Sequence, residues 1–329
     1  VVRPVSLEDR YTVEEGTVFL TGVQALVRLP LDQARRDRRA GLRTGTVISG
    51  YPGSPLGGYD LELERVARLL RPHDIVHIPG VNEETGAAIA WGSQLLDLFH
   101  HSRFDGVTGI WYGKSPGVDR CGDIFRHGNY GGGPRHCALI ALAGDDPSAK
   151  SSTLPNASEW AFVNCGMPVL YPATVAEMLE LGLHAIAMSR FAGLWVGFKT
   201  VTNLCDGAAT VHVSPDWPET VYPEATIDGR RFRKPHSAIF LPPGSQELER
   251  SLYEERLLAA QAYARANRLD RAIVAHRHDR VGIVAAGKTF SDLWQALADL
   301  GLDEEELAAL GVRLLKLSLI YPLNPQTVR

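Results

Sequence analysis

The sequence has 329 residues, of which 45% are hydrophobic and 22% charged, and its formal net charge is −4. These values are ordinary for a globular protein. The slightly acidic balance excludes both the basic footprint of a nucleic-acid-binding protein and a polybasic membrane signal. No run of 18 apolar residues occurs, and the polar start VVRPVSLEDR is unlike a signal peptide. We therefore expect a cytoplasmic protein with neither a nucleic acid nor a membrane as a partner.

Cysteine and histidine offer no local catalytic or metal-binding arrangement. The four cysteines are spread along the chain without a CxxC pair: Cys121, Cys137, Cys165 and Cys205. This spacing predicts buried or reduced thiols, with no zinc or iron–sulfur site formed by this chain alone. His127 and His136 flank a glycine-rich stretch, but neither completes a Ser-His-Asp or Cys-His set. We interpret them as loop histidines without an assigned role.

Helical and strand-like patterns alternate from about residue 17 to residue 203. Apolar residues at helical spacing predict helices over 18–41, 61–70, 83–99 and 175–191. Short apolar runs predict strands at 46–50, 75–79, 106–113, 137–144, 168–172 and 194–201. Strands that are apolar along their whole length are buried on both faces, as in a parallel sheet covered by helices. We therefore predict a doubly wound α/β fold with a mostly parallel sheet of about six strands, and ligands at its carboxyl edge.

The composition changes after residue 205. Residues 213–249 are rich in proline and charge, which predicts an extended connector, and residues 250–273 have the pattern of a charged helix. Residues 280–326 follow the order strand, helix, short helix, strand. We therefore divide the chain into three parts: 1–212, a connector over 213–279, and the start of a second α/β domain at 280–329. About 50 residues are too few for that domain alone, so we expect further polypeptide to complete it.

The segment Gly50–Gly58 (GYPGSPLGG) follows a predicted strand and precedes a predicted helix. Its glycines let the backbone approach a ligand closely, and Ser54 or free N–H groups at the helix start can hold an anion. The segment matches neither the GxGxxG fingerprint nor a Walker loop. An ordinary tight turn is the alternative interpretation.

Two acids, Glu83 and Glu84, stand at the start of a predicted helix and precede the small residues Gly86, Ala87 and Ala88. Acids in a first helical turn suit the helix dipole, and small residues allow close packing, so a purely structural role is sufficient. A functional role is the other possibility. An acid at the sheet edge, beside residues small enough to admit a flat ring, can serve a cofactor.

Two further segments follow predicted strands. Lys114 and Arg120, within Tyr112–Arg120, place positive charge where a substrate carboxylate can bind, with surface solvation as the alternative. The segment Gly144–Ser152 begins Gly-Asp-Asp, a pattern compatible with a metal ion held by hard oxygen ligands. We favour a polar loop that lines the site or an interface.

Four motifs, YPGSPLGGYD, VNEETGAAIAWGSQ, WYGKSPGVDR and GDDPSAKSS, occur in this order. Together they resemble the large, fused indolepyruvate ferredoxin oxidoreductases of bacteria. The resemblance covers roughly residues 15–329. It implies that 1–212 is the pyrimidine-binding domain of a thiamine-diphosphate enzyme. It also implies that 280–329 begins a domain like the C-terminal domain of transketolase.

The resemblance also implies roles for individual residues. In this family a glutamate hydrogen-bonds the aminopyrimidine ring nitrogen and favours the imino tautomer, which activates the cofactor. Glu84 fits that position best, and Glu83 is the alternative if the register shifts by one. The loop residues that would contact the cofactor are Tyr51, Pro52 and Gly53. The residues that would bind the substrate carboxylate are Ser54, Lys114 and Arg120.

The family's remaining chemistry is expected outside this chain. The Gly-Asp-Gly…Asn motif that binds magnesium diphosphate is absent, because the third residue is Asp146 and Asn156 comes too soon. Mg²⁺ and the iron–sulfur clusters are therefore expected from the rest of the enzyme. We expect as partners the diphosphate-binding, cluster and gamma-type domains, ferredoxin, coenzyme A and a 2-oxoacid. A dimeric assembly is also expected, because thiamine enzymes build their sites between domains.

Two other functions remain open from the sequence. The chain can be part of a different thiamine enzyme, such as a non-oxidative decarboxylase or a synthase. It can also be a non-catalytic α/β module that only scaffolds a partner. The substrate is open as well, with arylpyruvates such as indolepyruvate as the family expectation and branched-chain 2-oxoacids as the alternative.

Overall fold

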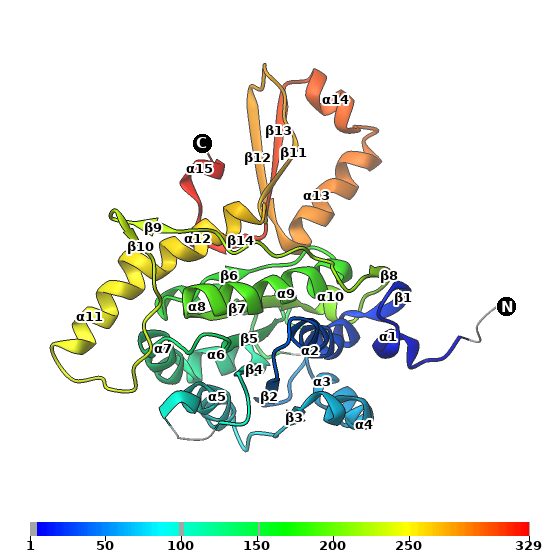
Figure 1. The fold of residues 1–329 in the computed structure, drawn as a ribbon. Coiled ribbons are helices and arrows are strands. Elements are labelled where there is room, and N and C mark those ends of the chain that lie inside the picture. The colour runs from blue at the N-terminus through cyan, green and yellow to red at the C-terminus, as the bar shows by residue number, and fades with distance from the viewer. Residues whose placement is uncertain (1–4, 99–101, 151, 329) are drawn as a thin grey trace.

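The computed structural model describes residues 5–98, 102–150 and 152–328, and its main body is a seven-stranded sheet between helices (Figure 1). The strand order is β14-β6-β7-β5-β4-β2-β3. Six neighbouring strands are parallel: β2 (Thr44–Gly50), β3 (Ile75–His77), β4 (Gly106–Lys114), β5 (Ala138–Asp145), β6 (Val169–Leu170) and β7 (Trp195–Val201). The predicted α/β fold with a mostly parallel sheet is thereby confirmed. A seventh strand, β14 (Leu319–Tyr321), pairs antiparallel with β6 and was not predicted.

Both faces of the sheet are covered, as the uninterrupted apolar strands predict. Successive side chains of a strand point to opposite faces, so Ile110 and Tyr112 join one buried cluster while Trp111 joins another. The first cluster is closed by α2 (Gly22–Arg39), α9 (Val175–Ala192) and α12 (Leu257–Ala266). The second is closed by α5 (Glu83–Gly92), α6 (Ser115–Arg120), α7 (Gly122–Gly131) and α8 (Glu159–Asn164). All residues of β5 and β7 are buried.

Shorter elements complete the main body. Those before β4 are α1 (Asp9–Thr12), α3 (Tyr59–Arg65), α4 (Ala67–Leu70), η1 (Arg71–His73) and η2 (Ser93–Leu98). Those after β7 are α10 (Thr202–Cys205), β8 (Ala208–Val213), β9 (Thr226–Ile227), β10 (Arg230–Arg231), α11 (Gly244–Ser251) and η3 (Leu252–Arg256). The four cysteines are buried and unbridged. Among the described residues, no helix has both the length and the hydrophobicity needed to cross a bilayer.

The prediction of a helix over 18–41 was wrong at its start. Residues Gly16–Thr21 form strand β1, which pairs antiparallel with β8 as a separate two-stranded sheet. The helix begins only at Gly22, because the Thr21 hydroxyl accepts the Gln24 amide and the Gln24 side-chain oxygen accepts the Thr21 amide. Local pattern does not predict this strand, because its partner β8 lies almost two hundred residues away in sequence. The segment that forms β8 was itself not predicted as a strand.

Two other predicted helices were too long. The helix predicted over 250–273 ends at Ala266, and Arg271–Val274 forms β11 because it pairs with β13 (Val312–Leu317). The helix predicted over 83–99 is α-helical only to Gly92 and continues as η2, and residue 99 lies outside the described residues. The connector predicted over 213–249 is extended for most of its length, but α11 begins within it.

The C-terminal part forms a small second sheet beside the main body (Figure 1). Its strand order is β11-β13-β12, with β12 (Val281–Ala286) parallel to β13. The connecting helices are α13 (Gly287–Asp299) and α14 (Glu304–Ala309), which confirms the predicted order of elements, and α15 (Pro325–Val328) follows β14. The domain boundary proposed at residue 280 stays a prediction.

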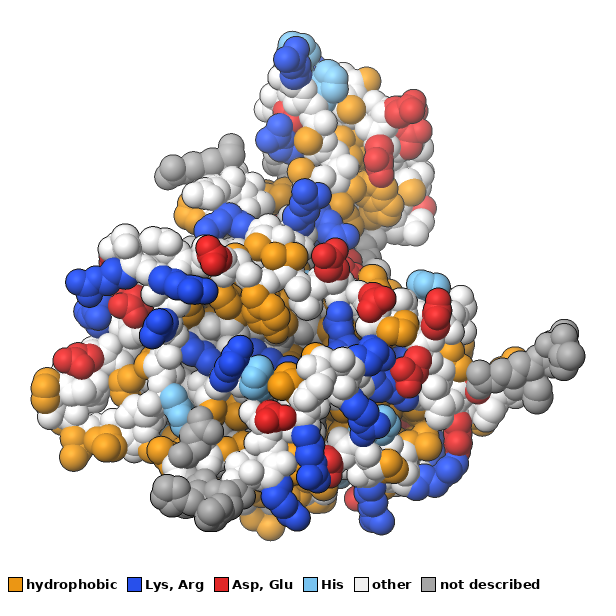
Figure 2. Space-filling model, viewed as in Figure 1, with side chains coloured by type: hydrophobic (Ala, Val, Ile, Leu, Met, Phe, Trp, Pro, Cys, Tyr) orange, Lys and Arg blue, Asp and Glu red, His pale blue; other side chains and the backbone are white. Residues whose placement is uncertain are grey.

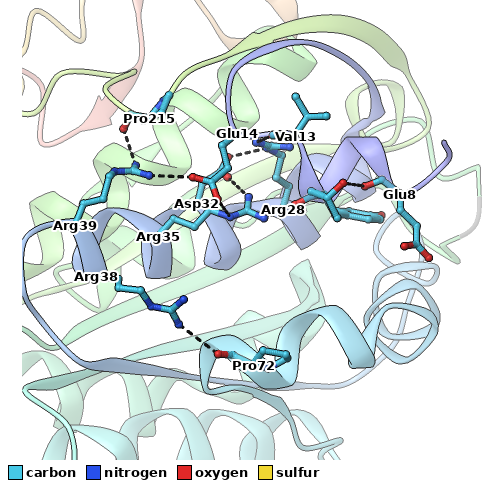
Figure 3. A network of polar contacts seen from close by, with 12 residues as sticks. Glu8, Val13, Glu14, Arg28, Asp32, Arg35, Arg38, Arg39, Pro72 and Pro215 are labelled. Carbon is cyan, nitrogen blue, oxygen red and sulfur yellow. Dashed lines mark hydrogen bonds and ion pairs between the residues drawn. The ribbon is translucent and has the colours of Figure 1, made fainter. Parts of the chain in front are cut away.

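The arginines of α2 attach the N-terminal segment to the main body (Figure 3). Arg28 is almost fully buried and donates to the Val13 carbonyl at 2.7 Å and to Asp32 at 2.7 Å. Arg35 also pairs with Asp32, at 2.8 Å, and Arg39 donates to Glu14 at 3.2 Å. The basic end of this helix therefore has a structural role, because its charges neutralise acids of its own chain and cap backbone carbonyls.

The packing of α9 against α12 includes a buried histidine. His184 lies 2.9 Å from the Tyr263 hydroxyl, measured at Nδ1, and only 3% of its surface is exposed. Burial, with Arg36 and Arg271 adding to it, lowers the pKa of His184 to about 4. The folded protein therefore holds this ring neutral at a pH at which the unfolded chain protonates it.

We predict an acid-dependent loss of stability from His184. Because its pKa is depressed in the folded state, its contribution is complete above about pH 6.5 and is lost as the pH falls toward 4. The free energy of unfolding should drop by about 2 kcal/mol between pH 7.5 and pH 5 from this group alone. Urea titrations at both pH values measure it. His184→Gln keeps a neutral partner for Tyr263, and its pH dependence should be weaker by that amount; equal pH dependence in the two proteins would contradict the assignment.

Candidate active site at the carboxyl edge of the sheet

Three of the four motifs begin at the carboxyl ends of neighbouring strands. Gly50 at the end of β2 is in register with Tyr112 of β4, and Lys114 at the end of β4 is in register with Gly144 of β5. The loop after β2 also folds over β5, since a Cβ placed on Gly144 would lie 2.8 Å from the ring of Pro55. The parallel sheet thus brings these loops together at the edge where ligands bind in open α/β folds.

The fourth motif reaches the same edge through a contact between backbones. A Cβ placed on Gly86 would lie 2.7 Å from Gly50 Cα, so α5 lies directly against the end of β2. The Gly80 amide donates to the Gly50 carbonyl at 3.0 Å and fixes the turn that leads into α5. Glycine at position 86 permits this approach, and glycine at position 50 avoids a clash with the Tyr112 carbonyl of β4. The first turn of α5 is therefore placed at the carboxyl edge.

Glu83 and Glu84 occupy that first turn. Asn82 caps the helix by accepting the Thr85 amide at 2.8 Å, and the Glu83 carbonyl accepts the Trp111 indole N–H at 3.0 Å. The Glu83 side chain is 19% exposed and the Glu84 side chain 36%. Both acids lie at the positive end of the helix dipole, as predicted for a first turn.

Arg120 at the end of α6 faces these two glutamates. Its Nε atom lies 3.2 Å from Glu84 Oε1 and 3.6 Å from Glu83 Oε2. The other carboxylate oxygen of Glu84, Oε2, is buried and has no hydrogen-bond partner among the described residues. A buried carboxylate oxygen without a donor is unfavourable, and a ligand that donates a hydrogen bond there would satisfy it.

The predicted substrate and cofactor residues of the loop after β2 lie close to Lys114. The aliphatic part of Lys114 covers Gly53, because a Cβ there would lie 2.6 Å from Lys114 Cδ. The Tyr51 amide donates to the Tyr112 carbonyl at 3.1 Å. The side chain of Tyr51 is 43% exposed, Pro52 is exposed and Ser54 is half-buried. The backbone of this loop is therefore anchored to β4, with the side chains of Tyr51 and Pro52 exposed and those of Pro55 and Leu56 buried.

The Gly-Asp-Asp segment is held inside the protein. Asp145 is fully buried, and its Oδ2 atom accepts the Ser158 amide at 2.9 Å and lies 2.8 Å from Lys199 Nζ. Lys199 also pairs with Glu159 at 2.6 Å. Burial raises the pKa of Asp145, against the opposing effect of Lys199. Within the described residues no group of three or more acids, histidines and cysteines has metal-binding geometry.

The two loop histidines take different positions. His127 donates from Nδ1 to the Asp123 carbonyl at 2.9 Å, within its own helix. His136 precedes β5 and therefore lies at the opposite, amino edge of the sheet. Sequence reasoning missed Gly80, Trp111 and Lys199, which position the site from other segments. Of these, only Trp111 belongs to a quoted motif, and its contact with Glu83 spans 28 positions.

Comparison with known proteins gives matches over the C-terminal part and over nearly the whole chain. Residues 270–329 match the family model described as indolepyruvate ferredoxin oxidoreductase middle domain. The chain is 26% identical over 321 residues to the indolepyruvate oxidoreductase subunit IorA of Methanothermobacter thermautotrophicus, covering 97% of this chain and 45% of that protein. The Archaeoglobus fulgidus protein of the same name is 25% identical over 324 residues, covering 98% and 46%. The chain thus spans about half the length of these relatives.

A solved structure shows the same fold. It is a 2-oxoglutarate:ferredoxin oxidoreductase from Magnetococcus marinus with 2-oxoglutarate, coenzyme A and succinyl-CoA bound. The TM-score is 0.64 at 14% identity, over 94% of this chain and 55% of that one. The chain therefore shares the fold of that oxidoreductase. In sequence it is similar to the indolepyruvate oxidoreductase subunits over nearly its whole length, which agrees with the resemblance of its four motifs.

We predict that Gly86→Ala destabilises the protein by about 1–3 kcal/mol, because the added methyl group would overlap Gly50 backbone atoms that have no room to move. Gly92→Ala, on the same helix, is the matched control. Nothing lies within 4 Å of a Cβ there, so this change should be neutral or stabilising by up to about 1 kcal/mol. Urea unfolding of both variants measures the difference. Equal effects would contradict the close contact between α5 and β2.

Proposed function

We propose that this chain is the pyrimidine-binding part of a thiamine-diphosphate-dependent 2-oxoacid:ferredoxin oxidoreductase of the indolepyruvate type. The reaction is the oxidative decarboxylation of an arylpyruvate, such as indolepyruvate, to the acyl-CoA with reduction of ferredoxin. One observation carries the proposal for this chain. Glu84, in the first turn of a helix held at the carboxyl edge, has a buried oxygen for which the described residues supply no donor.

The residues at this edge fit the cofactor's aminopyrimidine ring. Glu84 Oε2 is an acceptor in need of a donor, and a protonated ring nitrogen supplies one. The close contact of Gly86 with Gly50 places this acid beside the loop after β2. Tyr51, Pro52 and Gly53 form the neighbouring loop and would contact the ring. Thiamine diphosphate, when bound, supplies the carbon nucleophile that attacks a 2-oxo group.

The role of Glu84 is to hold a proton-bearing ring nitrogen in one tautomer and one orientation. Its Oε1 atom is occupied by Arg120 at 3.2 Å, which leaves Oε2 as the acceptor. Glu83 is the alternative, but its carbonyl is bound by Trp111 and its side chain packs on Gly117, where a Cβ would lie 2.8 Å from Glu83 Cγ. These contacts favour a positioning role for Glu83 and acceptance of the ring proton by Glu84.

The substrate carboxylate would bind among Ser54, Lys114 and Arg120. A hydroxyl and two cations suit a 2-oxoacid, whose carboxylate prefers charge-assisted donors. Lys114 belongs to the same loop cluster as Ser54, since its stem covers Gly53. Arg120 would donate hydrogen bonds to the substrate carboxylate while its Nε atom stays next to Glu83 and Glu84.

The rest of the enzyme would be supplied by further polypeptide. The relatives named indolepyruvate oxidoreductase subunit IorA are about twice the length of this chain. We propose that diphosphate-binding, cluster and gamma-type domains provide Mg²⁺ and iron–sulfur clusters, and that the assembly is dimeric. Ferredoxin, coenzyme A and the 2-oxoacid would be its partners in solution. The division into 1–212, 213–279 and 280–329 belongs to the same proposal.

We predict that Glu84→Gln lowers turnover of the assembled enzyme at least about 100-fold, the scale of losing a proton-transfer group. The assay is thiamine-dependent reduction of a viologen dye by indolepyruvate and coenzyme A. Glu83→Gln is the matched control, with the same change one position away on the same helix turn, and should retain most of the activity.

The two variants separate the possible outcomes. Loss of activity only in Glu83→Gln would transfer the role to that residue. Full activity in both would reject the thiamine assignment for this edge and favour a scaffolding module. A wild-type enzyme that is inactive with every arylpyruvate but active with a branched-chain 2-oxoacid would change the substrate and keep the cofactor.

A further inference from the structure

A large cavity lies at the opposite edge of the sheet from the candidate active site. Its volume is about 660 Å³, and it is formed by the C-terminal halves of α2 and α9, the segment before β5 and residues 220–234 of the connector. Arg135 and His136 immediately precede β5, and Leu42 immediately precedes β2, so the cavity faces the amino ends of the strands. The motifs of the active edge contribute no residue to its lining.

The lining of this cavity is strongly cationic. It contains Arg36, Arg135, Arg190 and Lys234 against a single carboxylate, Asp37. That carboxylate is already neutralised by two hydrogen bonds from Arg190, of 2.6 and 2.7 Å. The remaining cations leave the cavity positive. Figure 2 shows lysine and arginine side chains gathered over the middle of the face on which α2 and α9 lie.

Two of the cations, Lys234 and Arg36, donate hydrogen bonds to backbone carbonyls. Lys234 donates to the Pro134 carbonyl at 2.6 Å, and Arg36 donates to the Pro218 carbonyl. Arg190 is 8% exposed, and its Nε atom is buried without a hydrogen-bond partner among the described residues. Outside the Asp37–Arg190 pair, the cations of this lining are Arg36, Arg135 and Lys234.

An aromatic wall adjoins the charged one. Phe191 lies between Tyr222 and Phe232, with ring centroids 6.3 Å and 5.8 Å away, and all three line the cavity. Tyr222 is 52% exposed, so part of its ring surface is available. Flat rings bind on aromatic side chains, and phosphate groups bind to arginine and lysine. Gln33 and Thr220, also in the lining, offer polar groups for a base or a sugar.

We propose that this cavity binds a nucleotide, with its phosphates on Arg36, Arg135 and Lys234 and its ring against Phe191, Tyr222 and Phe232. The volume suits a ligand of that size. The site is separate from the active edge, so the ligand is not a reactant bound beside Glu84. A free nucleoside polyphosphate and the nucleotide part of coenzyme A share this chemistry, and the experiment distinguishes them.

The test is calorimetric titration of the assembled enzyme with ATP, adenosine, inorganic pyrophosphate and coenzyme A. ATP should bind, and adenosine and pyrophosphate should each bind at least ten-fold more weakly, because each lacks one half of the recognised chemistry. Coenzyme A that displaces ATP identifies the coenzyme as the natural source, and coenzyme A that fails to displace it identifies a free nucleotide. Pyrophosphate that binds as tightly as ATP overturns the nucleotide proposal. The proposal is also overturned if ATP does not bind, which is the result expected when other polypeptide of the assembled enzyme fills the cavity.

Variants locate the binding. Arg135→Ser should weaken ATP binding about ten-fold, the scale of one charge-assisted contact, and Tyr222→Leu should weaken ATP more than pyrophosphate. Arg277→Ser is the matched control, because it removes another exposed arginine, one that lies outside the cavity, and it should leave binding unchanged. Unchanged ATP binding in Arg135→Ser and Tyr222→Leu, with native circular dichroism, overturns the proposal. Glu84→Gln should leave ATP binding intact, so failure here is distinguishable from failure of the proposed catalytic function.

Discussion

The contact between Gly86 and Gly50 determines the geometry of the carboxyl edge. Because Gly86 has no side chain, the first turn of α5 lies on the end of β2, and the Gly80 amide ties the preceding turn to the Gly50 carbonyl. The acids of that turn then face Arg120, the last residue of α6, which follows β4. A larger residue at position 86 would separate α5 from the sheet and move Glu84 away from the loops that form the rest of the candidate site.

The opposite edge depends on a different interaction, the buried pair of Asp37 and Arg190. The pair joins the C-terminal halves of α2 and α9, and Thr44 at the start of β2 adds a hydrogen bond to the same carboxylate at 2.7 Å. A buried ion pair contributes little net stability but fixes geometry, because either partner alone would be left uncompensated. It holds the two helices at the separation that leaves a cavity between their ends and the connector.

The sequence predicted those features that depend on local pattern. Uninterrupted apolar runs identified all six parallel strands, and glycine-rich loops after them identified the carboxyl edge. Strands β1 and β11 were missed because the strands that they pair with, β8 and β13, are distant in sequence. The helix that ends at Ala266 was therefore predicted to continue through β11. In the site, the acids and cations were found, but the pairing of Arg120 with Glu84 depends on two helices meeting in space. The cavity at the amino edge draws on residues from 33 to 234, and no local motif marks it.

The Gly-Asp-Asp segment lies at the carboxyl edge of the sheet, but the contacts of Asp145 are structural. Asp145 holds Lys199, and the Lys199 ammonium lies 5.2 Å from the centre of the Tyr171 ring. That ring closely covers Gly287, the first residue of α13, where a Cβ would lie 2.3 Å from it. The buried charge at the end of β5 thus supports the surface on which the C-terminal sheet rests, while β14 joins the two parts by pairing with β6. The ion pair with Lys199 gives this buried carboxylate a structural role without invoking a metal ion.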